Sequence, residues 1–365
     1  MTNVSLVWNI LTYQQEIKIT MNWVTTLKMI IVLSTCFFFI SVNGMMLFVL
    51  RSKPSFRETP RYILFAHMLL NDSIHLLISM LLYILAMLYL HLVRAVCAVL
   101  VLLSSTTFYN TPLNLAVMAL ERYIAICFPL RHSEMATPQR TGVAIAVVWF
   151  LGSVNHLIDV FVPLITEPSF LLTPVFCTRE QILMFKWQAN VYQGFTAFYF
   201  VCVGLILVFT YVAIMLEARS VSSDKASVTK ARNTVLLHTI QLCLCLTSFL
   251  YGVIEALIAR MDASVFIHLR YMNFIVLLIL PRCLSPLIYG LRDESLKTIF
   301  KYYLTCGSKK VKPAEPIQAP DLRASKGPRL RRHCKTSLVK PRARGYDGSV
   351  RLPVGLVVVP AVGIN

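Results

Sequence analysis

Charged residues are scarce in this chain of 365 residues: Asp, Glu, Lys and Arg make up 14% of it, and hydrophobic residues make up 57%. Water-soluble domains have about 25% charged and about 45–50% apolar residues. The chain therefore lacks the polar surface that two or three soluble domains would need, although its length alone would suggest that many. This composition favours a bundle of helices in a lipid bilayer.

Acidic residues are especially few, because 17 Asp and Glu are outnumbered by 35 Lys and Arg. From Thr305 to the end there are 13 basic and three acidic residues, so the tail holds more than half of the net charge of +18. The excess marks a tail and not a nucleic-acid-binding core, and nucleic acid is not an expected partner. We predict a basic, disordered cytoplasmic tail at residues 305–365, which are rich in Pro, Arg and Lys and have little periodicity.

Motifs of catalysis are missing as well. The sequence has no His-Glu-x-x-His, Gly-x-Ser-x-Gly or phosphate-loop pattern, and its histidines are scattered, so neither an enzyme nor a metal site is expected. The absence of an internal repeat of three or more helices counts against inverted-repeat transporters. A retinal-type pump would need a lysine in the last apolar run, and residues 265–290 contain none.

Seven runs are apolar and long enough to cross a bilayer, which takes about 20 residues at 1.5 Å per residue. They are residues 27–50, 62–90, 94–127, 142–165, 189–216, 228–259 and 265–290. The third run contains Pro112, where we expect an interruption of the helix. The predicted fold is an all-α membrane protein, a bundle of seven transmembrane helices.

The orientation of this bundle follows from Lys and Arg in the loops, which gather on the cytoplasmic side. One side has 13 such residues and the other has six. The richer side has Arg51, Lys53, Arg57, Arg61, Arg131, Arg140, Arg219, Lys225, Lys230, Arg232, Arg292, Lys297 and Lys301. We therefore expect residues 1–26 to form an extracellular N-terminal tail of a multi-pass plasma-membrane protein. Asn3 begins a glycosylation sequon in that tail.

Two of the ten cysteines face the oxidising side in this orientation, Cys97 at the top of the third helix and Cys177 in the loop before the fifth. Thiols in an oxidising compartment tend to pair, so we predict a disulfide between them. The alternative is two unpaired thiols, which that compartment disfavours.

The inner end of the third helix has a distinctive string at residues 118–132, Met-Ala-Leu-Glu-Arg-Tyr-Ile-Ala-Ile-Cys-Phe-Pro-Leu-Arg-His. A buried arginine is costly unless it is paired, and Glu121 is a local partner for Arg122. For an isolated Glu121-Arg122-Tyr123 triplet, an arginine that merely reaches the lipid headgroups would be the better interpretation.

The whole string resembles the signature of odorant receptors, a branch of the rhodopsin-like G-protein-coupled receptors. Other positions extend the resemblance over residues 27–304, and the chain looks closest to fish-type odorant receptors. The matching residues are Asn43, Asp72, Trp149, Tyr211, the run from Ser285 to Asp293, and the Leu250-Tyr251-Gly252 of the sixth helix. Ser285 stands where the family usually has asparagine.

The resemblance implies a receptor that binds a small-molecule odorant outside and activates a heterotrimeric G protein of the stimulatory, olfactory type inside. Its activation switch would consist of Glu121, Arg122, Tyr123, Tyr211, Pro286 and Tyr289. Asp72 would lie in mid-membrane with Asn43, Asn114 and Ser285 as candidate partners, and the family suggests a sodium ion there. The alternative is a hydrogen-bonded packing node without an ion. No other cofactor is expected.

Ten side chains are candidates for a ligand pocket between the third, fifth, sixth and seventh helices. They are Ser104, Ser105, Phe108, Tyr109, Phe195, Thr196, Tyr199, Tyr251, Glu255 and Ile275. Each alone is more often a packing residue, but together they describe an aromatic, weakly polar cavity. Glu255 could pair with a cationic ligand or face water, and an internal pair with Arg260 or Arg270 is the first choice.

After the seventh helix, Leu296, Ile299, Phe300 and Tyr303 recur at helical spacing, which predicts a short amphipathic eighth helix on the inner leaflet. Cys306 follows it and is a palmitoylation candidate, although a plain reduced thiol is equally compatible. The predicted receptor domain spans residues 27–304.

Two alternatives stay open. A non-olfactory rhodopsin-like receptor is the nearer one, and the string at residues 118–132 argues against it. A multi-pass channel or transporter would need several charges along a membrane pathway, and only Asp72 is expected to lie deep among the helices.

Overall fold

A computed structural model describes residues 22–221, 240 and 243–292 of the chain. Its long helices are α2 (Trp23–Ser52), α4 (Pro60–Met87), α5 (Arg94–Cys127), α7 (Pro138–Thr166), α8 (Lys186–Val221), α10 (Tyr251–Ile258), α11 (Ala263–Asn273) and α12 (Leu280–Arg292). Short elements connect them: α3 (Pro54–Glu58), α6 (His132–Met135), the turns Pro129–Arg131, Pro168–Leu172 and Ser248–Leu250, the π-helical segment Phe274–Ile279, and the strands β1 (His91–Val93) and β2 (Pro174–Phe176).

The length of the apolar runs and the residues at their ends explain where the helices begin and end. Six helices in the described residues are long and apolar enough to cross a membrane, and the shorter apolar segment Cys243–Ile258 belongs to the predicted sixth span. The side chain of Asn22 accepts a hydrogen bond from the backbone N of Thr25 and so caps α2, while Thr137 caps α7 in the same way. Pro60 stands in the first turn of α4, where its missing N–H costs nothing.

Two details differ from the sequence prediction. The expected interruption at Pro112 is wrong, because α5 continues through it, as membrane helices allow when neighbouring groups satisfy the freed carbonyl. The seventh span contains a π-helical segment at Phe274–Ile279, so its helical register changes between α11 and α12. In addition, β1 and β2 form a small antiparallel pair in a chain predicted to be all-α.

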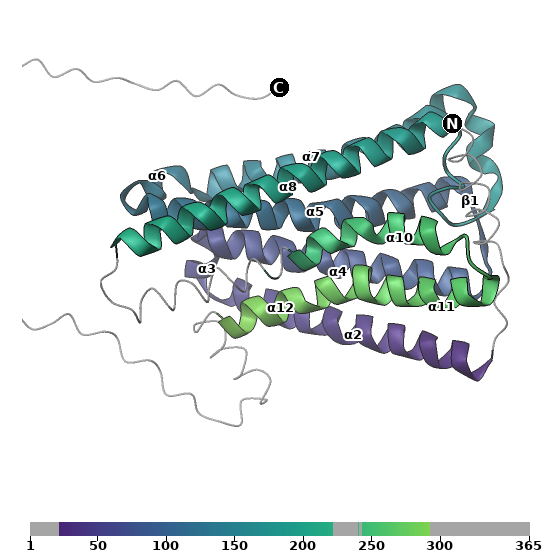
Figure 1. Cartoon of the computed structure of the whole chain (residues 1–365), viewed down its shortest axis with the longest axis horizontal. Helices are drawn as coiled ribbons and strands as arrows, with labels where there is room; N and C mark the ends of the chain where they lie inside the picture. The colour runs from purple at the N-terminus through teal and green to yellow at the C-terminus, as the bar shows by residue number, and fades with distance from the viewer. Residues whose placement is uncertain (1–21, 222–239, 241–242, 293–365) are drawn as a thin grey trace, which may run out of the picture. The chain divides into compact units, whose positions relative to one another are not determined.

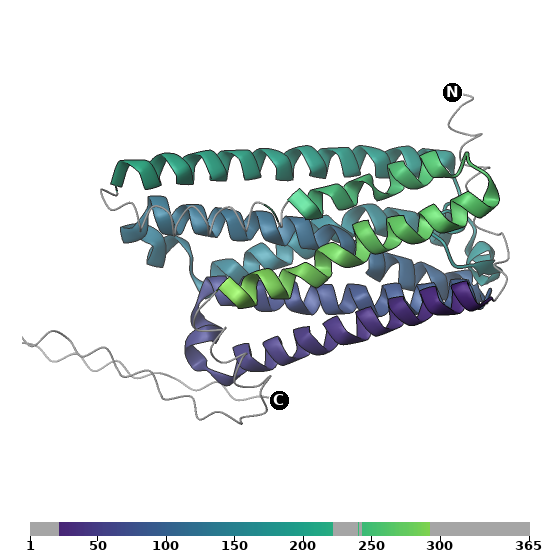
Figure 2. The same cartoon turned by 60° about the horizontal axis from the view of Figure 1, so that its bottom comes forward.

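Figures 1 and 2 show the long helices running side by side, with β1 at one end and α3 and α6 at the other. We call the end with β1 the sheet end. Arg51, Arg57, Arg131 and Arg140 lie in or beside the short elements at the opposite end. The first two loops that the charge count assigned to one side of the membrane, which the structure describes, are therefore at one end of the bundle.

Helix α5 is the centre of the packing and contacts α4, α7 and α8. Its approach to α7 is close at Gly152, where an added Cβ would collide with the side-chain amide of Asn110 and lie 3.2 Å from the carbonyl O of Thr106. Asn110 is fully buried, so it has little space to move away. Only glycine fits at this crossing.

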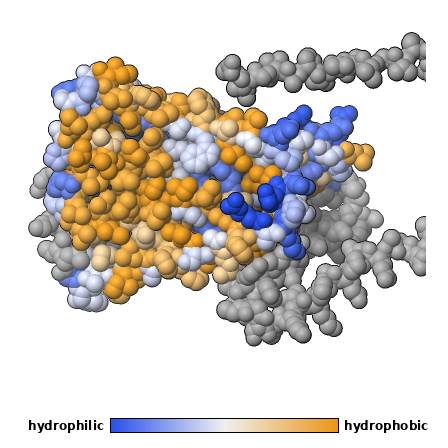
Figure 3. Space-filling model, turned by 180° about the vertical axis from the view of Figure 1, so that it is seen from behind, coloured by the Kyte–Doolittle hydropathy of each residue, from blue (hydrophilic) through white to orange (hydrophobic). Residues whose placement is uncertain are grey.

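The outer surface of the bundle is apolar, as lipid requires. Large apolar side chains are exposed on each of the first five long helices, for example Phe37, Leu77, Val99, Phe150 and Phe198. Figure 3 shows this hydrophobic surface along the side of the bundle, with hydrophilic residues gathered towards the end that carries α6. Exposed apolar surface of this extent is unusual for a soluble monomer.

The sheet end is tied together by strand pairing, a disulfide and an arginine. His91 pairs with Phe176 and Val93 with Pro174. The predicted disulfide between Cys97 and Cys177 is confirmed, with the two Cα atoms 5.4 Å apart. Arg94 extends this connection, since its Nη1 donates to the carbonyl of Phe170 and its guanidinium lies 3.5 Å from the centre of that ring.

Several predicted features lie outside the described residues. They are the N-terminal tail with Asn3, the amphipathic eighth helix, Cys306 and the basic tail at 305–365. They stay predictions.

Replacing Gly152 by leucine should prevent α5 and α7 from packing, because the new side chain would overlap Asn110 and the α5 backbone. We expect a large loss of surface protein, measured by flow cytometry of an epitope-tagged chain. Gly142→Leu in the same helix is the matched control, since nothing lies within 4 Å of the position that its Cβ would take. Equal surface levels for the two variants would contradict the close crossing.

Candidate functional site

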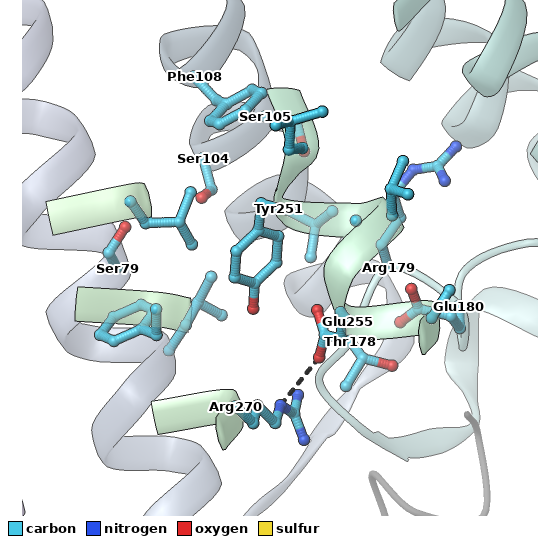
Figure 4. Close-up of a pocket in the computed structure, with 18 of the residues that line it drawn as sticks. Ser79, Ser104, Ser105, Phe108, Thr178, Arg179, Glu180, Tyr251, Glu255 and Arg270 are labelled. Atoms are coloured by element: carbon cyan, nitrogen blue, oxygen red, sulfur yellow. Dashed lines mark ion pairs between the residues drawn. The ribbon is translucent and has the colours of Figure 1, made fainter. Parts of the chain in front are cut away.

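A cavity of about 970 Å³ opens among the helices near the sheet end. Its walls come from α4, α5, α8, α10, α11 and the segment after β2, and Figure 4 shows part of this lining. The volume is in the range that small-molecule sites occupy, and most of the lining is apolar or aromatic. The cavity could therefore enclose a small organic ligand.

Seven of the ten predicted ligand residues line this cavity. They are Ser104, Ser105, Phe108, Tyr109, Thr196, Tyr251 and Glu255. The other three pack elsewhere: Phe195 lies against Tyr199, the hydroxyl of Tyr199 donates to the carbonyl of Leu151, and Ile275 packs beside the cluster of Cys36, Leu76 and Ile279. Thr196 faces the cavity, whereas the hydroxyl of Tyr199, three residues later in α8, reaches Leu151 of α7, so the rotation of α8 about its axis decides which residues line the cavity.

An aromatic group forms the inner wall around Tyr109. Its ring centre lies 5.4 Å from that of Tyr199, 5.7 Å from that of Phe249 and 5.2 Å from that of Phe108. Its hydroxyl is 2.6 Å from Oγ1 of Thr196. Since the Thr196 hydroxyl donates to the backbone of its own helix, Tyr109 is the donor in this contact. Aromatic packing and this bond join α5 to α8 beneath the cavity.

Glu255 is one of the charged residues in the cavity wall, and its side chain is almost fully buried. Its Oε1 lies 2.9 Å from Nε of Arg270, so the structure selects one of the two internal partners that the sequence left open. Figure 4 shows this ion pair with Glu180 and Thr178 nearby. The pair joins α10 to α11 and neutralises a charge that would otherwise be costly next to the apolar walls.

The segment after Cys177 is held over the cavity by Arg179. Its Nη2 donates to Oδ2 of Asp159 at 2.7 Å, and its guanidinium lies 3.7 Å from the ring centre of Tyr192. Asp159 also lies 3.7 Å from Nδ1 of His156, and both are buried in α7. Sequence reasoning missed this contact, although the position of Arg179 two residues after a predicted disulfide was a usable signal.

Sequence reasoning also missed the contribution of α4 and α2 to the cavity. His75, Ser79 and Tyr83 line it from α4, and Lys28 lines it from α2. Lys28 lies 2.8 Å from Nδ1 of His268, which connects the first and last spans. The apolar runs alone gave no indication of which faces of these two helices turn inwards.

The four residues of the predicted polar cluster are fully buried, but they do not all converge. Oδ1 of Asp72 accepts a hydrogen bond from Thr111 at 2.8 Å. Asn114 instead lies 3.1 Å from Nδ1 of His67 and donates to the carbonyl of Leu64. Trp149 donates to the other nitrogen of His67 at 2.9 Å. Asn114 thus belongs to a separate network that joins α4, α5 and α7.

The predicted activation residues lie towards the end opposite the sheet. Oε1 of Glu121 is 3.2 Å from Nε2 of His132, and the ring of Tyr123 lies 5.2 Å from that of Phe209 in α8. Arg122 is half-buried, Tyr211 is partly exposed and Pro286 is buried in α12. The backbone of Tyr289 belongs to α12, and its side chain is outside the described set.

Comparisons with known proteins agree with this arrangement. Residues 42–289 match the model of the seven-transmembrane receptors of the rhodopsin family. The chain belongs to this family. This receptor is 36% identical over 272 residues to Odorant receptor 131-2 of Danio rerio, covering 73% of the chain and 82% of that relative. It is also 28% identical over 202 residues to the human Olfactory receptor 2M3, covering 53% of the chain and 62% of that relative.

The expectation that only Asp72 lies deep among the helices is wrong. Glu255, Asp159 and Arg282 of the receptor are also buried, and Arg282 lies within the predicted seventh span. Asp159 and Glu255 pair with arginines at the sheet end. The charge argument against a channel or transporter therefore fails, whereas the family match itself favours a signalling receptor.

Removing the disulfide should destabilise the sheet end, because Cys97 and Cys177 close a loop of 80 residues. We expect Cys97→Ser, Cys177→Ser and the double variant each to lose about 2–5 kcal/mol of folding stability. All three should therefore stay in the endoplasmic reticulum. Surface biotinylation measures the loss. Cys243→Ser changes an exposed free thiol and should reach the surface normally. Normal surface levels of both single disulfide variants would contradict a structural role.

Breaking the Glu255–Arg270 pair should lower the stability of the receptor. We expect Glu255→Ala to lower the free energy of unfolding by about 1–3 kcal/mol. This loss is smaller than the loss expected on breaking a fully buried ion pair, because Arg270 keeps part of its side chain exposed. The measurement is thermal unfolding of the purified receptor with a thiol-reactive dye. Arg260→Ala, at an exposed position on the cavity rim, is the control and should change the midpoint little. A similar loss in both variants would mean that the pair is not the cause.

Proposed function

We propose that this protein is an odorant receptor of the plasma membrane that couples the binding of a small molecule to activation of a heterotrimeric G protein. Its relation to Odorant receptor 131-2 of Danio rerio carries the proposal, since 36% identity extends over most of both chains. In the proposed orientation the N-terminus and the sheet end are extracellular, and the end with α3 and α6 is cytoplasmic. The excess of basic loop residues at that end supports this orientation.

The cavity beneath the disulfide-tied segment is the proposed odorant site. Its aromatic walls suit the apolar body of an odorant, and Ser104 and Ser105 offer hydroxyl groups to a carbonyl, hydroxyl or amine of the ligand. Glu255 and Arg270 are already paired, so a neutral or weakly polar ligand can bind without breaking an ion pair.

Signalling would then be a shift between two packings of the helices. Tyr109 and Phe108 extend from the cavity wall into the aromatic contacts of α5 with α8 and Phe249, so a ligand can bias how these helices pack. At the cytoplasmic end, the opened state would expose Arg122 and Tyr211 to a G protein of the stimulatory type, as the family resemblance implies.

A second candidate is a non-olfactory receptor of the same family. The supporting observation is 22% identity over 275 residues with the human Probable G-protein coupled receptor 148, covering 78% of that relative. The lower identity makes it the weaker candidate.

A cAMP reporter in cells that express the full chain tests the proposal. We expect at least one of four panels, amino acids, amines, steroids and small volatiles, to raise cAMP in a dose-dependent way. Arg122→Ala should abolish the response at an unchanged surface level. A surface-expressed chain that responds to none of the panels would contradict odorant reception, and a normal response of Arg122→Ala would contradict the assigned switch.

A cavity-filling substitution locates the site once a responding compound is known. Ser105→Phe should raise the half-effective concentration at least about tenfold, which corresponds to about 1.4 kcal/mol of lost binding energy. Val99→Phe adds a similar ring at an exposed position of the same helix and should leave the response unchanged. Equal responses of the two variants would place the ligand elsewhere.

A further inference from the structure

Arg282 in α12 is a charged side chain buried in the middle of the bundle, with 1% of its surface exposed. Its Nη1 donates to the carbonyl of Leu278 at 2.9 Å and lies 3.4 Å from the hydroxyl of Ser248. Its Nη2 lies 3.5 Å from the carbonyl of Phe108, and the guanidinium is 5.0 Å from the centre of that ring. Neutral groups of three spans thus hold this cation, and its Nε has no hydrogen-bond partner in the described part of the chain.

Asp72 in α4 is the acidic counterpart, and its exposure is 0%. Thr111 donates to its carboxylate, and Asn71 and Ser285 lie beside it. Thr111, which holds Asp72, and Phe108, which Arg282 contacts, lie three residues apart on one face of α5, so the two charges lie against the same turn of that helix, although no direct ion pair joins them among the described residues. A buried anion of α4 and a buried cation of α12 thus share the neighbourhood of α5, where their opposite charges attract each other.

The family resemblance implies a sodium ion beside Asp72. Whether the receptor can hold this ion depends on the residues that surround the carboxylate. Oxygen donors are present: the Asp72 carboxylate, the Thr111 hydroxyl that donates to it and the Ser285 hydroxyl beside it. The charge balance does not fit. With Arg282 in place, sodium would leave one buried carboxylate facing two cations, and an uncompensated charge is strongly unfavourable in a low-dielectric interior.

We propose that the guanidinium of Arg282 is the permanent cation of this cluster and that the receptor therefore takes up no sodium ion beside Asp72. The positive charge that an ion would bring from solution is supplied by the seventh span itself. Stability and signalling of this receptor are then independent of the sodium concentration. The inference concerns the bundle alone and stands whether or not the ligand is an odorant.

Thermal unfolding of the purified full-length receptor in detergent tests the proposal directly. The buffer contains sodium, potassium or N-methylglucamine chloride at one ionic strength, so that only the cation differs. The wild type should have the same midpoint in all three. Arg282→Ser should be specifically stabilised by sodium, by roughly 3 °C at concentrations well above its dissociation constant, because the carboxylate and the oxygen donors remain without their cation.

Controls assign the effect to the cluster. Arg282→Lys keeps a cation and should stay insensitive to sodium. In the double variant Asp72→Asn, Arg282→Ser the sodium response should disappear, because the carboxylate is gone. A sodium-specific rise in the wild type would overturn the proposal, and so would the absence of any sodium effect in a folded Arg282→Ser protein.

A double-mutant cycle keeps the proposal testable if Arg282→Ser does not fold. Surface abundance is measured for Asp72→Asn, Arg282→Ser and the double variant in the full chain. Each single substitution leaves one buried charge uncompensated, so the double variant should recover well above the level expected from the two separate losses. Additive losses would show that the two charges do not compensate each other and would overturn the proposal.

Discussion

A polar or charged group buried among lipid-facing helices has no water to bond with, so its partners must come from the bundle itself. This requirement shapes the interior of the molecule. Asp159 is bonded to Arg179, Glu255 to Arg270, and Asp72 to Thr111 with Arg282 nearby. Each of these contacts joins two different elements of the chain. Compensation of buried charge is thus also what holds the helices and the segment after Cys177 in register.

Helix α5 brings these contacts together because it lies at the centre of the bundle. Its first turn carries Cys97, its middle carries Phe108 and Tyr109 in the cavity wall, and its last turns carry Glu121 and Arg122. The close crossing at Gly152 holds it against α7. One continuous helix therefore links the disulfide-tied end, the cavity and the opposite end, and a rigid helix transmits a displacement better than a broken one.

The floor of the cavity and the buried charges beneath it are in direct contact. Phe108 and Leu278 line the cavity and also contact the guanidinium of Arg282, while His75 lines it from α4. A bound molecule that moves the Phe108 ring would act on a cation that balances Asp72. Because the proposed cation is a side chain of α12, the charge balance between Arg282 and Asp72 changes only when α12 moves against α4. An ion from solution cannot restore it.

The sequence determined the seven-span prediction, the disulfide and the family, because these depend on apolar length, compartment and a string of adjacent residues. It also identified part of the cavity wall, since one face of α5 follows from helical spacing. Rotation and register were decided only by tertiary packing. Tyr199 reaches α7 while Thr196 faces the cavity, and the π-helical segment shifts the face on which Ile275 lies. The partners of Asn114, Glu255 and Arg282 likewise come from other spans, distant in the sequence, and no local pattern specifies which of several buried polar groups will meet.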